Sequence, residues 1–406
     1  FARLLLDEFR RVCAAARMDY YDRLTYYITD SSPTTIRQWL DGGIFAAHSG
    51  HVVTAVCDAL SPGELRSHEG ESIPLPPLSA VFLNYLLDQL PADLIRRTEQ
   101  GIERLCVRTH LSGDDGPLEL WRHPTVNLVR ALAESDQPSD QAELLRLLPL
   151  LEFETEYRAA ETTIPYAEIA MSLEEAPPQV VVSHGAVRCV AECRRLLRND
   201  GFVLVRDFGT DTVAGARARF PTRLAATMQL PVNFPLIERL VTDEGWDLLE
   251  ATERDAPQIE TRLVCRSGQA ALQAAFLDTF RRGDWERADS AIVEARRHRE
   301  ASRHTQACEA YRLATRLAPR NWWVLAEAGE FNAVWLGDAY AGLDLIERAV
   351  EINPWTSPHV WNVKGVCLRR LRRWEEACDA FTAAQDLDPN DVRAAAGLAN
   401  CLTHCG

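Results

Sequence analysis

The stretch "WNVKGVCLRRLRRWEEACDAFTAAQDLDP" at residues 361–389 decides the fold of the last third of this 406-residue chain. Prolines at positions 319, 354 and 389 recur with a period of 35, and an alanine stands five residues before each of them. A fixed period of this length is typical of helix pairs that stack on one another. Large and small residues occupy set places in the quoted unit: Trp361, Gly365, Trp374, Ala377, Phe381, Ala384 and Pro389.

This spacing resembles that of tetratricopeptide repeats. Earlier units keep fewer of these residues, and a fourth unit begins at Asp391. We expect about three repeats plus a partial fourth over residues 288–406, after a linker helix at 268–287. Stacked pairs form a concave surface that suits a protein or peptide partner. The repeat aromatics are expected mainly in the core.

Up to about residue 265, β-like runs alternate with helical stretches, which predicts an α/β sheet. Continuous runs of Val, Ile and Leu favour parallel strands that are buried on both faces. Ser32 and Pro33 signal the start of a helix at 32–43. A second helix is expected at 184–200. Strands are expected at 23–30, 51–60, 77–91 and 201–209, with a closing antiparallel pair within 245–267.

Residues 112–179 are polar and interrupted by prolines, and they are interpreted as an insertion after an added β-ribbon at 101–111. Within the insertion, residues 140–160 are expected to be helical. The first domain therefore spans 1–267.

The formal net charge of −15 and the pI near 5.2 oppose binding to a phosphate backbone, so no nucleic-acid partner is expected. The basic run at 369–373 lies in a repeat.

No apolar stretch is long enough to cross a membrane. The eleven cysteines lack metal-ligand spacing, so we expect no metal and reduced thiols in a cytoplasmic protein.

In α/β sheets, ligands bind at the carboxyl ends of the strands. The expected strands end on Asp30, Asp58, Asn84 and Asp207, with Asn84 in "VFLNYLLDQLP" at 81–91. Acidic and amide groups suit a ligand with hydroxyls and an amine. The sequence has no GxxxxGK[ST] loop, which argues against a triphosphate.

Most of these residues have a structural alternative. Asp30 can cap the helix that follows it, and Asp58 can be a turn residue. Tyr85 can be a packing residue, and Asp88 can cap the turn before Pro91. Asn84 at a strand end is hard to explain as a core residue.

The series "YYITDSSP", "HVVTAVCDAL", "VFLNYLLDQLP" and "GFVLVRDFG" resembles class I S-adenosylmethionine-dependent methyltransferases. It is most similar to the MidA type, bacterial and mitochondrial proteins known for arginine methylation of a respiratory complex I subunit. The resemblance covers about residues 1–265. Its matches are Asp30, Ser32 and Pro33, then Asn84, Asp88, Leu90 and Pro91, and then Asp207-Phe208-Gly209.

The resemblance implies a Rossmann-like sheet and S-adenosyl-L-methionine as cofactor. It implies that Asp30, with Ser32 beside it, binds the ribose, that Asp58 and Ala59 meet the adenine, and that Asn84 lines the cleft near the methyl group. A glycine-rich loop is expected ahead of the helix that begins at Phe1.

The resemblance also gives Asn84, Tyr85 and Asp88 as catalytic candidates. Tyr85 stands where arginine-methylating relatives have Glu, and a phenol cannot pair bidentately with a guanidinium. We hypothesise a methyltransferase whose repeats recruit a protein substrate. A catalytically inactive scaffold and a small-molecule methyltransferase are the alternatives.

Overall fold

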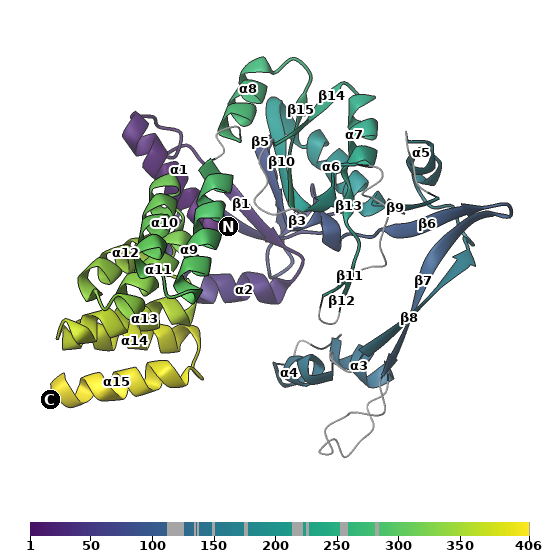
Figure 1. Cartoon of the computed structure of the whole chain (residues 1–406). Coiled ribbons are helices and arrows are strands. Elements are labelled where there is room, and N and C mark those ends of the chain that lie inside the picture. The colour runs from purple at the N-terminus through teal and green to yellow at the C-terminus, as the bar shows by residue number, and fades with distance from the viewer. Residues whose placement is uncertain are drawn as a thin grey trace. The chain divides into compact units, whose positions relative to one another are not determined.

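A computed structural model describes residues 1–111, 126–133, 135, 138–147, 151–173, 178–212, 222–224, 227–251, 259–280 and 284–405. The chain forms two compact units. One consists of Ala16–Thr279, and the other joins Phe1–Ala15 to Phe280–Gly406. Helix α1 (Ala2–Ala16) therefore falls in the second unit, whereas the sequence analysis counted it in the first domain. Figure 1 labels the elements of both units.

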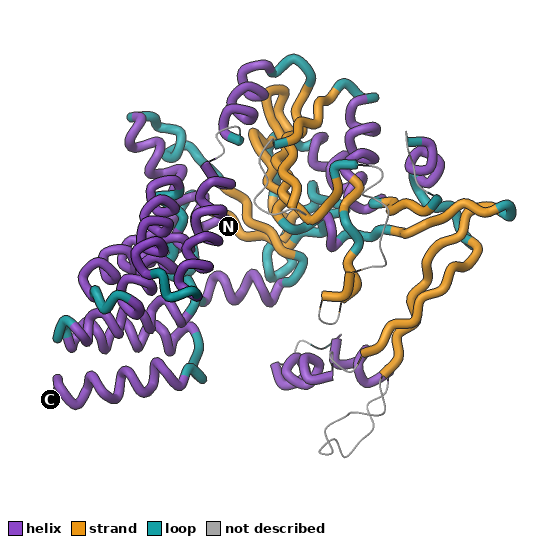
Figure 2. The backbone as a smooth tube through the Cα atoms, viewed as in Figure 1, coloured by secondary structure: helices purple, strands orange, loops and turns teal. Residues whose placement is uncertain are grey.

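The second unit is helical throughout its described residues (Figure 2). Its helices pack in sequence order, α9 with α10, α11 with α12 and α13 with α14, and α15 follows. A π-helical turn, η4 (Phe331–Trp335), ends the third helix of the series. The helices are α9 (Asp284–Glu300), α10 (His304–Leu317), α11 (Trp322–Glu330), α12 (Ala339–Ile352), α13 (Pro358–Arg370), α14 (Trp374–Leu387) and α15 (Val392–Cys405).

Small residues let these helices approach closely. The fully buried Phe381 ring lies between Gly365 and Gly397. A Cβ atom added at Gly365 would lie 2.7 Å from the ring, and one at Gly397 would lie 2.5 Å from it. The repeat pattern in the sequence therefore records a real steric requirement. The expectation that repeat aromatics are mainly core holds for Tyr311, which is 1% exposed, and for Phe381. It is wrong for four exposed residues, Trp323, Trp335, Tyr340 and Trp355.

The main sheet of the first unit runs β5 (Leu78–Asn84), β10 (Leu197–Thr210), β15 (Ile259–Arg266) and β14 (Trp246–Glu250). β5 and β10 are parallel, while β15 is antiparallel to both β10 and β14. The closing antiparallel pair expected within 245–267 is thus confirmed. The short strand β13 (Val232–Asn233) pairs with the last residues of β10.

A second sheet contains the parallel pair β1 (Tyr26–Asp30) and β2 (Val52–Val56), extended by β3 (Leu65–Arg66) and β4 (Ser72–Ile73). Helix α2 (Pro33–Asp41) begins as expected, because the Ser32 hydroxyl accepts a hydrogen bond from the Thr35 N–H. The sequence analysis expected one sheet of parallel strands closed by an antiparallel pair. The described strands instead form mixed sheets, because short hairpins such as β3–β4 add antiparallel partners.

A third sheet holds the ribbon. Its order is β8-β7-β6-β9, and neighbouring strands are antiparallel. The predicted helix over 140–160 is wrong in its second half, where "LEFETEYRA" is a strand. Its alternation of apolar and acidic residues has the period of two typical of strands. The elements are β6 (Asp93–Thr98), β7 (Gly101–Leu111), α3 (Val126–Ala133), α4 (Pro138–Leu147), β8 (Leu151–Ala159), α5 (Ala167–Ser172) and β9 (Gln179–Val182).

Helices α6 (His184–Arg195) and α7 (Phe234–Thr242) pack on β10 and on each other. They form the largest apolar core together with side chains of β5, β9 and β10. The linker helix expected over 268–287 corresponds in part to α8 (Ala270–Thr279), while residues 284–287 belong to α9. The remaining short elements are η1 (Ala46–His48), η2 (Leu87–Gln89), β11 (Thr222–Leu224) and β12 (Thr227–Gln229). Within the described residues, no helix combines the length and apolarity needed to cross a membrane.

Candidate functional site

The carboxyl edge of β5 and β10 brings together a group of polar side chains, Asn84, Tyr85, Asp88 and Asp207, which we call the strand-edge cluster. Asn84 is the last residue of β5 and lies opposite Arg206 of β10. The next residue, Tyr85, donates its N–H to the Arg206 carbonyl at 2.8 Å. Its φ angle is +52° and its side chain is 49% exposed. Left-handed backbone is unfavourable for a bulky residue, so the turn after β5 is strained and presents a phenol to solvent.

Asp207 fixes this turn from β10. Its carboxylate is fully buried and accepts three backbone N–H groups, from Leu86 at 2.8 Å, Leu87 at 2.6 Å and Phe208 at 2.8 Å. Burial and the neighbouring Asp88 carboxylate nevertheless raise the pKa of Asp207 to about 7, because they outweigh the three donors. A carboxyl group that titrates near neutral pH at a strand edge is typical of a functional site.

Asp88 lies in η2, beside the Asp207 carboxylate. It accepts hydrogen bonds from the side-chain amides of Gln89 and Gln229, the first at 3.0 Å. Gln229 belongs to β12, 141 residues away in sequence, and no sequence signal pointed to it. The structure therefore gives Asp88 a role in holding two segments together, and within the described residues its carboxylate makes no capping hydrogen bond in the turn before Pro91.

Asp30 and Asp58 share the carboxyl edge of the other parallel pair, since the Cys57 N–H donates to the Asp30 carbonyl at 2.9 Å. One carboxylate oxygen of each caps a local turn: Asp30 accepts the Ser32 N–H at 2.8 Å, and Asp58 accepts the Leu60 N–H at 2.9 Å. Asp30 therefore does not cap α2, whose N-cap is Ser32, whereas Asp58 fits its turn alternative. Oδ2 of both residues accepts no hydrogen bond from the described part of the chain. Ala59 packs against the main core.

No strand ladder joins β1 or β2 to β5 among the strands the structure describes. The structure therefore groups the predicted residues into two sets. Asn84, Tyr85 and Asp88 lie at one strand edge, and Asp30, Ser32, Asp58 and Ala59 lie at the other.

Three free thiols, Cys57, Cys189 and Cys193, lie near one another behind this second edge. Burial raises the pKa of Cys57 to about 11, and a hydrogen bond with Cys189 raises that of Cys193. Such thiols are protonated and unreactive at neutral pH. No cluster suited to a metal ion occurs among the described side chains.

In the helical unit, polar side chains connect the first helices of successive pairs, and we call these contacts the inter-helix ladder. Arg296 of α9 pairs bidentately with Glu327 of α11, at 2.8 and 2.7 Å. The buried Tyr311 hydroxyl donates to the same carboxylate at 3.0 Å. Burial and the Glu327 charge raise the pKa of Tyr311.

The ladder continues along the series. Glu330 pairs with His359 at 3.0 Å, which lowers the pKa of the carboxyl group and raises that of the imidazole. Further on, the amide of Asn362 donates to Asp391 at 2.6 Å, and Arg369 donates to Asn400 at 3.4 Å. Residues 29 or 31 positions apart in sequence thus meet along one series of helices.

Residues 358–391 match the family model of the tetratricopeptide repeat. The C-terminal helices form a tetratricopeptide repeat region, and such repeats indicate protein–protein interaction. No curated protein matches the chain.

Similar solved structures include the TPR domain of Arabidopsis OM64, at 17% identity over 30% of this chain and 99% of that one, with a TM-score of 0.29. The first TPR of Spaghetti (RPAP3), bound to an HSP90 peptide, is 16% identical over 30% and 94%, with a TM-score of 0.28. The Sgt2 TPR domain from Aspergillus fumigatus is 17% identical over 29% and 78%, with a TM-score of 0.27.

Proposed function

We propose that the protein is an S-adenosylmethionine-dependent methyltransferase that acts on a protein substrate held by its tetratricopeptide repeats. One observation carries the proposal: acidic and amide side chains follow parallel strands at their carboxyl ends, next to a sheet closed by an antiparallel pair. This is the arrangement that the resemblance to class I methyltransferases implies.

The residues fit the cofactor in one respect. Oδ2 of Asp30 and Oδ2 of Asp58 accept no hydrogen bond from the described residues, so each carboxylate can accept one from a ligand hydroxyl or amine. When bound, S-adenosylmethionine supplies an electrophilic methyl group. The protein then has to position the acceptor, which accounts for much of the rate in such reactions. In this proposal Asn84 lines the cleft, and Asp207 holds the turn that carries Tyr85 and Asp88.

Calorimetry on the full chain tests the cofactor site. We expect one mole of S-adenosylmethionine to bind per mole of protein, with the Kd raised at least tenfold by Asp58→Ala. Asp200→Ala is the matched control, because Asp200 is an exposed carboxylate beside Arg198 that faces no predicted ligand. If titration with S-adenosylmethionine up to saturating concentration gives no heat of binding, the proposal is wrong.

In the proposal, the partner surface lies on the helices that carry the inter-helix ladder. Transfer of labelled methyl groups to lysate proteins tests this assignment. We expect Arg369→Glu to reduce protein labelling several-fold while leaving the heat of cofactor binding unchanged. Arg23→Glu is the control, since Arg23 lies in the other unit and pairs with Asp19.

The exposed Tyr85 favours a second candidate, a scaffold that binds the cofactor without transferring its methyl group. Cofactor heat without labelled protein would support the scaffold. Label that appears in low-mass products alone would instead identify a small-molecule methyltransferase.

A further inference from the structure

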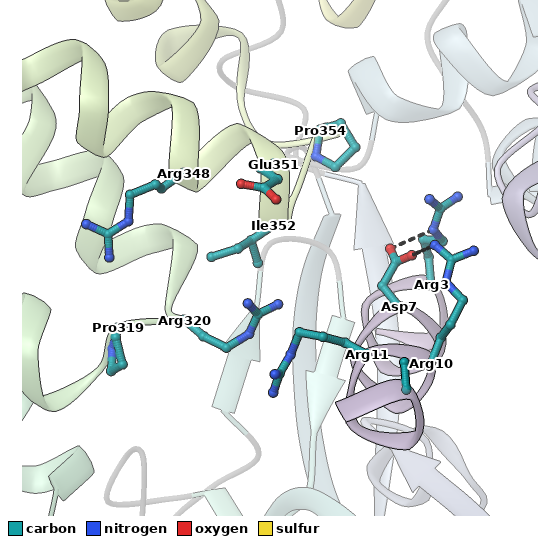
Figure 3. A pocket seen from close by; sticks show the side chains of 11 residues that line it. Arg3, Asp7, Arg10, Arg11, Pro319, Arg320, Arg348, Glu351, Ile352 and Pro354 are labelled. Carbon is teal, nitrogen blue, oxygen red and sulfur yellow. Dashed lines mark hydrogen bonds and ion pairs between the residues drawn. The ribbon is translucent and has the colours of Figure 1, made fainter. Parts of the chain in front are cut away.

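A cavity of about 660 Å³ lies within the helical unit, between α1 and the ends of the first two repeats. Figure 3 shows the side chains that line it. α1 contributes one wall, and the other comes from the turn after α10 and from the end of α12. The chain brings these walls together from positions more than 300 residues apart.

The cavity is basic although the protein is acidic. Five guanidinium groups line it, those of Arg3, Arg10, Arg11, Arg320 and Arg348. Two carboxylates, Asp7 and Glu351, also line it. In a chain with a formal charge of −15, this local reversal of sign marks a place that attracts anions.

Two carboxylates are each shared between two arginines. Asp7 accepts hydrogen bonds from Arg3 at 2.8 Å and from Arg10 at 3.4 Å. Glu8 pairs with Arg11 of its own helix and with Arg320 of the opposite wall, which lies 2.9 Å away. In the second set two guanidinium groups face one carboxylate, so Glu8, Arg11 and Arg320 together carry a net charge of +1. The guanidinium groups of Arg11 and Arg320 extend toward each other in Figure 3.

We propose that this cavity, which we call the arginine cavity, binds the phosphate monoester of a small organic phosphate. A phosphate monoester carries a charge between about −1.5 and −2 at neutral pH, which is the sign that the five lining arginines attract. A guanidinium group has five N–H donors, so one that already contacts a carboxylate can still donate to phosphate oxygens. Arg11 and Arg320 are about half exposed, so a ligand can reach both.

The size and walls of the cavity indicate an organic ligand. About 660 Å³ lies within the range of small-molecule sites, roughly 300–1,000 Å³, and exceeds what a free phosphate ion fills. Pro319, Ile352 and Pro354 add apolar surface beside the arginines. That surface suits the carbon skeleton of the ligand, while the guanidinium groups hold its phosphate.

Calorimetry of the full chain with glucose 6-phosphate as the probe tests this site. We expect one binding event per chain, with the Kd raised at least tenfold by Arg11→Gln and by Arg320→Gln. Arg320→Lys keeps the charge without the fork, and we expect it to lose part of the affinity. Arg373→Gln is the matched control, because Arg373 forms an exposed i,i+3 pair with Glu376 like that of Arg11 with Glu8. Circular dichroism verifies that each variant is folded.

The phosphate source and its charge are tested separately. Affinity for glucose 6-phosphate should rise between pH 5.5 and 7.5, as the monoester loses its second proton near pH 6. Inorganic phosphate should bind more weakly, since it lacks the carbon skeleton. The proposal is overturned by a Kd that the Arg11 and Arg320 variants leave unchanged, by equal loss in Arg373→Gln, or by binding of a phosphoserine peptide without glucose 6-phosphate.

Discussion

The carboxylate of Asp207 accepts a hydrogen bond of 2.6 Å from the backbone N–H of Leu87, a residue 120 positions earlier in the chain. This contact ties the end of β10 to the turn that follows β5. The same carboxylate holds Leu86, so the backbone after Tyr85 has little freedom. The left-handed conformation of Tyr85 is thus maintained by a buried acid on the neighbouring strand.

The raised pKa of Asp207 predicts a pH dependence of stability. The group titrates near pH 7 in the folded protein and near 3.8 when unfolded, so between these values the folded state binds more protons. The free energy of unfolding therefore falls as the pH rises from about 4 to about 7. Thermal unfolding of the full chain at pH 5 and pH 8 should show a lower midpoint for the α/β unit at pH 8.

Asp207→Asn should remove that dependence. The amide cannot accept all three N–H groups, so we expect a loss of about 1–3 kcal/mol at pH 5 and a much flatter profile up to pH 8. Asp200→Asn, an exposed acid whose pKa is lowered, should leave the profile between pH 5 and 8 intact. An unchanged slope in Asp207→Asn would assign the dependence to another group.

The sequence predicted the repeat region well because its pattern is local. Each unit encodes where two helices touch, and Gly365 and Phe381 meet as their spacing requires. The start of α2 was equally readable, since Ser32 and Pro33 act on neighbouring N–H groups. Caps and helix contacts within one repeat depend on residues a few positions apart.

Features formed by segments far apart in the chain were harder to predict from the sequence. The strand β8 was read as a helix, although its partner β7 explains its alternating pattern. The bond between Gln229 and Asp88 joins segments that carry no shared motif. The arginine cavity needs α1 to pack beside the repeats, and the sequence analysis had placed that helix in the other domain. The roles of Asp30, Asp58 and Asn84 as ligand contacts stay predictions.

Gly365→Ala should destabilise the helical unit. The added methyl group would lie 2.7 Å from the Phe381 ring, and overpacking of this kind costs about 1–3 kcal/mol. We expect a thermal midpoint several degrees lower. Phe381→Leu in the same chain should recover part of the loss, and a double-mutant cycle measures that coupling. Strict additivity of the two changes would argue against contact between these residues.

The pair of Glu330 and His359 predicts a smaller effect of the same sign above about pH 6.5. Glu330 raises the pKa of His359 above 6.5, so the contribution of the imidazole is fully present below that value and is lost as the pH rises through the raised pKa. At acid pH the pair loses its effect when Glu330, whose pKa is lowered, becomes protonated. Both side chains are partly exposed, so we expect only about 0.2–1 kcal/mol. An NMR titration should show a lower His359 pKa in Glu330→Gln. Glu376→Gln, a change on the exposed face of α14, should leave that pKa unchanged.

Tyr85→Gly separates strain from side-chain function. Glycine adopts positive φ without steric cost, and a side chain that is 49% exposed contributes little packing. We therefore expect the free energy of unfolding to stay within about 1 kcal/mol of the parent or to rise. Tyr20→Gly, at a half-exposed tyrosine outside the left-handed region, should lower it by about 0.5–1 kcal/mol. A large loss of stability in Tyr85→Gly would show that the phenol packs the turn. Unchanged stability with lost methyl transfer would instead place the phenol in the acceptor site.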